Sequence, residues 1–135
     1  IVAGMARYGE RDGVAKILSD LFEAAKSVGR RMPELLCGFA GEIDEPPIAY
    51  PVACLPQAWA AGSVFMMLQA CLGISVDGVN GRIEICNPHL PIGIGEFTVA
   101  GLRVGAERVN LRFDQAARRV DVRTDSRSVE VDVIY

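Results

Sequence analysis

Histidine and tryptophan are the scarcest residues of this 135-residue chain, which has one of each, and its four cysteines form no Cys-x-x-Cys pair. A structural zinc site takes closely spaced Cys and His ligands, so the sequence argues against such a site. We expect no metal and no cofactor. The cysteines, Cys37, Cys54, Cys71 and Cys86, are widely spaced. This spacing favours free thiols in a reducing, cytoplasmic compartment over a disulfide framework.

The chain also lacks an excess of basic residues. Its 14 Lys and Arg against 17 Asp and Glu give a formal net charge of −3. Nucleic acids and anionic membranes are bound by basic side chains that replace counterions on phosphates, so we expect neither partner. The pairs Arg30-Arg31 and Arg118-Arg119 are interpreted as solvated surface. The most apolar stretch, residues 58–74, is shorter than the ~20 residues of a membrane span, which favours a buried core helix.

A starting methionine and a signal-peptide pattern are both missing at the N-terminus. The chain begins at Ile1 inside an apolar, helix-like run, and no charged segment precedes an apolar one as in a signal peptide. We therefore expect the chain to be a piece of a longer polypeptide.

Helical periodicity is clear at the start of the chain. Residues 2–8 have the pattern of a short helix that ends at Gly9. Apolar side chains then recur at i, i+3, i+4 and i+7 from residue 14 to residue 28, which predicts an amphipathic helix. Asp12 is its expected N-cap and Gly29 its expected C-cap.

A third helix is expected at residues 56–72, with Pro56 at its first position and Gly73 as its stop. This helix is apolar nearly all round, which predicts burial on most sides. Residues 30–55 form a long Pro-rich connection before it, and connections of this length are often functional.

Period-2 alternation replaces helical periodicity in the second half of the chain. Five segments alternate: residues 82–86, 96–99, 107–113, 119–123 and 128–134. They predict an antiparallel sheet with one solvated face. The expected fold class is α+β, with helices in residues 1–74 and a β-rich part in residues 75–135. Three helices cannot easily cover their own apolar surface, so we expect partner helices upstream.

Two neighbouring segments carry the candidate site. Residues 31–39, Arg-Met-Pro-Glu-Leu-Leu-Cys-Gly-Phe, place Glu34 in a loop between two helix patterns. Residues 50–59, Tyr-Pro-Val-Ala-Cys-Leu-Pro-Gln-Ala-Trp, lead to Gln57 and Trp59 at the start of an apolar helix. A carboxylate close to an aromatic ring is an arrangement suited to binding a sugar. Glycoside hydrolysis usually needs two carboxyl groups, so these segments supply half of an active site.

These two segments resemble the C-terminal end of the amylo-α-1,6-glucosidase, or glycogen-debranching, family, and residues 101–105 and 109–113 resemble its β-rich tail. The resemblance implies that the helices are the last ones of an (α/α)6 toroid. It also implies metal-free, inverting hydrolysis of an α-1,6 or related α-glucosidic bond in a glycogen-like glucan. The implied partners are the α-glucan or oligosaccharide substrate and upstream toroid helices of the same polypeptide.

Glu34 stands where the family has its general base, which implies that it deprotonates the attacking water. An inverting enzyme places its general acid ~6.5–9.5 Å away, and the family takes this acid, an Asp, from an earlier loop. The chain alone is therefore expected to be inactive. Leu55 replaces the family's Ser, which costs a helix cap worth about 1 kcal/mol. Tyr50, Gln57 and Trp59 are the candidate substrate-binding residues.

Each of these residues also has a plain structural interpretation. Without the resemblance, Glu34 is a surface carboxylate of a loop. Trp59 suits packing in the first helical turn, Gln57 suits capping of the loop backbone, and Tyr50 suits anchoring of the loop. His89 is expected on the surface or in a loop. Two other function classes stay open: a non-catalytic carbohydrate-binding module, and a structural domain whose apolar helix forms a homo-oligomer interface.

Overall fold

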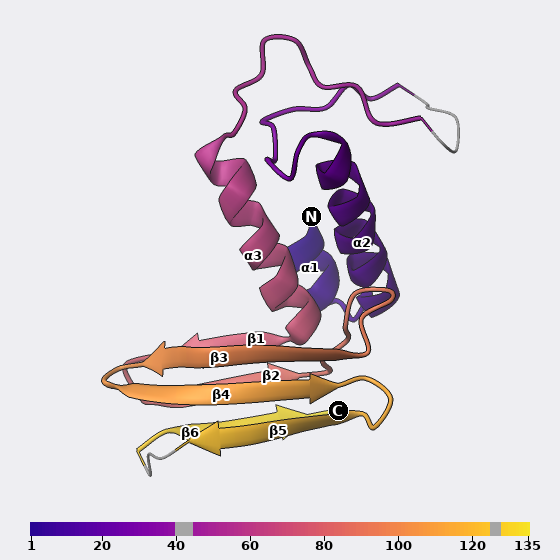
Figure 1. Ribbon diagram of the computed structural model, residues 1–135. Helices are drawn as coiled ribbons and strands as arrows, with labels where there is room; N and C mark the ends of the chain where they lie inside the picture. The colour runs from indigo at the N-terminus through magenta and orange to yellow at the C-terminus, as the bar shows by residue number, and fades with distance from the viewer. Residues whose placement is uncertain (40–44, 125–127) are drawn as a thin grey trace.

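The computed structural model describes residues 1–39, 45–124 and 128–135. The helices are α1 (Val2–Arg7), α2 (Arg11–Ser27) and α3 (Ala58–Leu72). The strands are β1 (Ile74–Asp77), β2 (Arg82–Cys86), β3 (Glu96–Val104), β4 (Glu107–Asp114), β5 (Arg119–Thr124) and β6 (Glu130–Ile134). Figure 1 shows the helices on one side of stacked sheets. This arrangement confirms the predicted α+β class.

The turn between α1 and α2 places the start of α2 earlier than predicted. Gly9 has φ of 85°, so the chain reverses there and α2 begins at Arg11, with Glu10 as its N-cap. Asp12 is therefore not the N-cap. It lies in the first turn, where a negative charge interacts favourably with the helix dipole. The helix ends at Ser27 with Val28 as its C-cap, so the predicted C-cap, Gly29, lies one residue too late; Gly29 follows the cap with φ of 64°.

The ends of α3 differ in how well the sequence predicts them. Pro56 is not the first helical residue, because the extended Gln57 is the N-cap and the helix begins at Ala58. Gly73 ends the helix as predicted, in the left-handed region. It also packs closely, since a Cβ at this position would lie 2.1 Å from the carbonyl oxygen of Cys86.

The third helix is buried on one face only. The buried side chains are Ala60, Met67, Cys71 and Leu72. On the opposite face Trp59, Phe65 and Met66 are 57%, 75% and 47% exposed. The predicted burial on most sides is therefore wrong within the described residues, because the only helices that pack beside α3 are α1 and α2. Within the same residues, no helix has the length and apolarity needed to cross a membrane.

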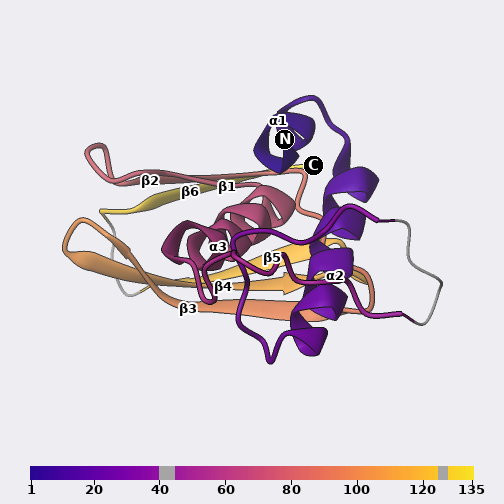
Figure 2. The same cartoon turned by 90° about the horizontal axis from the view of Figure 1, so that it is seen from above.

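The strands form two three-stranded sheets, ordered β1-β2-β6 and β3-β4-β5. All five alternating segments become strands, but the prediction of one antiparallel sheet is wrong. The strands β2 and β6 are parallel, which is possible because the chain builds the whole second sheet before it returns to the first. Figure 2 shows the sheets as two facing layers.

Two hydrophobic clusters hold these layers together. The cluster between the sheets contains Leu72, Ile83, Ile85, Leu90, Val104, Val109, Leu111 and Phe113. The cluster between the helices contains Val2, Ala6, Val14, Leu18, Met67 and Cys71. Leu68 packs against both clusters. Full burial of a side chain such as Phe113 contributes about 1.5–3 kcal/mol, so these clusters are the main source of stability.

Candidate functional site

The loop between α2 and α3 has two arms that run antiparallel. The Tyr50 N–H donates to the Leu35 carbonyl at 3.3 Å, and the Cys37 N–H donates to the Ile48 carbonyl at 2.8 Å. An isolated antiparallel bridge also joins the arms. In Figure 1 the loop connects the ends of α2 and α3 that lie away from the sheets. The pairing brings together residues 31–39 and 50–59, the two segments of the predicted site.

Glu34 is attached to the other arm through both its backbone and its side chain. Its N–H donates to the Cys54 carbonyl at 3.0 Å, and its Oε2 accepts from the Cys54 N–H at 3.4 Å. Pro33, directly before it, is buried. The backbone of Glu34 is therefore fixed to the turn at Cys54, and one oxygen of its carboxylate contacts the same turn.

The three candidate substrate-binding residues lie on or beside the same loop. Tyr50 is in the paired arm, and the Gln57 N–H donates to the Met32 carbonyl at 3.4 Å. Trp59 lies in the first turn of α3 and is exposed, so packing in the core does not explain it. Among the described residues, no hydrogen bond joins these side chains to one another or to Glu34. The structure brings their backbone segments together without forming a closed site.

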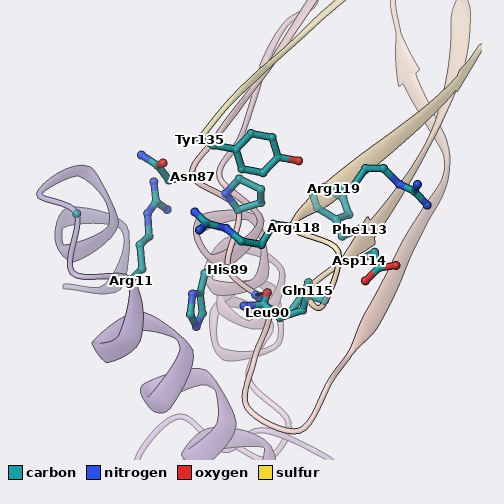
Figure 3. Close-up of a pocket in the computed structure, with 12 residues that line it drawn as sticks. Arg11, Asn87, His89, Leu90, Phe113, Asp114, Gln115, Arg118, Arg119 and Tyr135 are labelled. Atoms are coloured by element: carbon teal, nitrogen blue, oxygen red, sulfur yellow. Dashed lines mark hydrogen bonds between the residues drawn. The ribbon is translucent and has the colours of Figure 1, made fainter.

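A second candidate site is a cavity of about 460 Å³ between the helices and the sheets (Figure 3). Its polar lining includes Arg11, Asn87, His89, Asp114, Arg118 and Tyr135. These residues come from the start of α2, the connection after β2, the β4–β5 turn and the end of the chain. This site could not be predicted from the sequence, because its parts are far apart along the chain.

Arg11 fixes one wall of the cavity. Its guanidinium donates to the Ala70 carbonyl at 2.9 Å and to the Cys86 carbonyl at 3.0 Å. Its Nε is buried and has no hydrogen-bond partner. Burial raises the pKa of the nearby Cys71 thiol to about 11, and the Arg11 charge opposes this rise. Arg11 therefore ties the ends of α3 and β2 to the start of α2.

The connection after β2 forms a second wall, and backbone hydrogen bonds hold it. The His89 N–H donates to the Cys71 carbonyl at 2.9 Å, and the Leu90 N–H donates to Gln115 Oε1 at 2.9 Å. The His89 imidazole is one-third exposed, and its Nε2 lies 3.6 Å from Asp12 Oδ1. His89 is thus in a loop, as predicted, but it faces a cavity.

The β4–β5 turn supplies the third wall. Asp114 Oδ1 accepts from the Ala117 N–H at 2.9 Å, and the Arg118 N–H donates to the Gln115 carbonyl at 3.3 Å. Arg118 has φ of 47°, in the left-handed region that few non-Gly residues adopt. This tight turn determines where the Arg118 side chain leaves the backbone.

Two of the three arginines that line the cavity lie on one side of it, together with the histidine. Figure 3 shows the guanidinium groups of Arg11 and Arg118 and the imidazole of His89 on this side. The neighbouring Arg119 extends to the other side and forms an ion pair with Asp121 at 2.9 Å. The interpretation of Arg118 as solvated surface is therefore incomplete, because this exposed residue also lines a cavity.

Comparison with known proteins finds no match to the chain among protein-family models, curated proteins or solved structures. Within the described ranges, no group of three or more His, Cys, Asp or Glu side chains could hold a metal ion. The function is therefore inferred from the motifs and the two candidate sites of the chain itself.

Proposed function

We propose that the chain is the C-terminal part of an inverting glycoside hydrolase of the toroidal, debranching type, with Glu34 as the general base. The substrate is an α-1,6 or related α-glucosidic bond in a glycogen-like glucan. The general acid comes from an upstream segment of the same polypeptide. A cytoplasmic location belongs to the proposal, and the four free cysteines support it.

The attachment of Glu34 to the Cys54 turn is the observation that carries the proposal. A general base must hold its carboxylate in a fixed position relative to the attacking water. One oxygen of Glu34 accepts from the Cys54 N–H. The other has no hydrogen-bond donor among the described residues, which leaves it able to accept from a water. The two motifs that resemble the debranching family meet at this contact.

The exposed apolar face of α3 is a second support. Contiguous exposed apolar surface usually marks a contact with another element or molecule. Phe65 and Met66 are suited to packing against a neighbouring helix, and upstream toroid helices would provide one. Trp59 lies at the loop end of this face, where it is also suited to stacking on a sugar ring.

Two measurements test the proposal. An antibody against this chain reports the mass of the native polypeptide, for which we expect several times the 14.5 kDa of the chain. The native polypeptide should release glucose from α-1,6-linked oligosaccharides, and NMR of the first product should show the β-anomer. A native species of 14.5 kDa, or the α-anomer as first product, would contradict the proposal.

The exposed face of α3 also favours a second function, that of a structural or oligomerisation domain. In this case Trp59, Phe65 and Met66 would form an interface between copies of the chain. Light scattering of the purified chain would then show a stable oligomer, and glucan would not bind. Glucan binding without hydrolysis by any native species would instead favour a carbohydrate-binding module.

A further inference from the structure

We infer that the cavity lined by Arg11, His89 and Arg118 binds a small phosphate ester, at a site separate from Glu34. The loop that carries Glu34 follows the last residue of α2, whereas Arg11 is the first residue of that helix. A helix of 17 residues is about 25 Å long. The two sites therefore lie at opposite ends of α2, and the inference goes beyond the proposed hydrolase.

The charge of the cavity selects an anion. The guanidinium groups of Arg11 and Arg118 lie on one side of it, beside the imidazole of His89 (Figure 3), and like charges that gather in a cavity repel each other and attract an anion. Two carboxylates balance them only in part. Asp114 Oδ1 already accepts from a backbone N–H, and Asp12, 3.6 Å from the imidazole of His89, is almost fully exposed.

The guanidinium of Arg118 favours a phosphate group as the anion. It forms no hydrogen bond to a described residue, so its forked donors are available to a ligand. A planar guanidinium matches two oxygens of a phosphate at once. The buried, unpartnered Nε of Arg11 adds positive potential at the same wall. Together these groups provide a positive site for one compact, multiply charged head group.

The size and remaining lining of the cavity favour an ester over a polymer. Its volume of about 460 Å³ falls within the ~300–1,000 Å³ of small-molecule sites. Asn87 and Tyr135 add neutral hydrogen-bonding groups to the lining, which suit the hydroxyl groups of a small organic moiety. The overall charge of −3 argues against a nucleic acid as the source of the phosphate.

The test titrates the full 135-residue chain at low ionic strength with glucose 6-phosphate, inorganic phosphate and neutral glucose. Calorimetry should give saturable binding of glucose 6-phosphate and no binding of glucose. The only histidine of the chain is the NMR probe, and the imidazole resonances of His89 should shift with the same affinity. Absence of saturable binding of glucose 6-phosphate, equal binding of glucose, or binding of inorganic phosphate alone would each overturn the inference.

Two matched variants locate the binding. Arg118→Gln removes one charge from the cavity and should weaken glucose 6-phosphate binding by about tenfold or more, as expected for loss of a charge-assisted hydrogen bond. Arg103→Gln removes the same charge from an exposed position of β3 and should leave the affinity within about twofold, because Arg103 is not part of the cavity lining. Circular dichroism confirms that both variants fold. Equal weakening by the two variants would overturn the assignment to this cavity.

Discussion

Arg11 joins the helices to the sheets, and replacing it with Met is the perturbation that tests this junction. Met removes the hydrogen bonds to the Ala70 and Cys86 carbonyls but retains an apolar stem of similar length. Each hydrogen bond from a charged donor contributes about 1.5–3 kcal/mol, so the two bonds contribute about 3–6 kcal/mol together.

Two effects reduce this loss. The substitution also removes the buried Nε that has no partner, whose desolvation costs about 1–3 kcal/mol. Both hydrogen bonds are only partly buried, so water can replace part of each. We therefore expect Arg11→Met to lower the free energy of unfolding by about 2–3 kcal/mol.

The assay is urea unfolding followed by far-UV circular dichroism. Arg103→Met is the control, because Arg103 is an exposed residue of β3 and surface substitutions usually change stability by less than about 0.5 kcal/mol. If Arg11→Met unfolds within about 0.5 kcal/mol of the wild type, the two hydrogen bonds do not hold the junction and the reasoning is refuted.

The remaining predictions concern cysteines and glycines. Exposed Cys54 should react with a thiol reagent at pH 8 far faster than buried Cys71, because burial raises the pKa of Cys71 from 9.0 to about 11. Mass spectrometry of the labelled peptides measures both rates, and equal rates would contradict the prediction. The unfolded chain loses the Cys71 proton at a lower pH than the folded chain, in which burial raises the pKa. The contribution of Cys71 to the free energy of unfolding should therefore be fully present below pH 9.0 and fall as the pH rises towards 11, which thermal unfolding at several pH values can check. Gly73→Ala should lower the free energy of unfolding by at least about 2 kcal/mol, because a Cβ there meets the Cys86 carbonyl at positive φ. Gly62 is an interior residue of α3 at which a Cβ would meet no other atom, so Gly62→Ala should instead raise the free energy of unfolding by about 0.5–1 kcal/mol. Equal effects of the two variants in urea unfolding would contradict this explanation.

The sequence predicts the helices and most strands because their signals are local. The apolar spacing in α2 and the alternation in β4 (Glu107–Asp114) identify each element without reference to its neighbours. The strand β1 was missed because it has four residues, of which Ser75, Val76 and Asp77 are exposed. Short exposed segments of this kind have no periodic pattern that distinguishes them from a loop.

Pairing of strands and the make-up of the cavity depend on contacts between distant segments. Alternation in β6 is the same whether its partner runs parallel or antiparallel, so the parallel pairing with β2 could not be predicted. Likewise nothing near Arg118 in the sequence indicates that Arg11 lies across the same cavity. The proposed Glu34 site could be predicted from the sequence only because its two motifs are runs of neighbouring residues.

The hydrolysis rate of the native polypeptide with Glu34→Gln tests the central claim most directly, with Glu45→Gln as its control. Glu45 is an exposed carboxylate of the same loop, so the two variants remove the same charge from one loop. The account predicts that Glu34→Gln lowers kcat for an α-1,6-linked oligosaccharide by about 10²- to 10⁴-fold while substrate binding persists, and that Glu45→Gln hydrolyses like the wild type. A Glu34→Gln variant that hydrolyses at the wild-type rate would contradict the account.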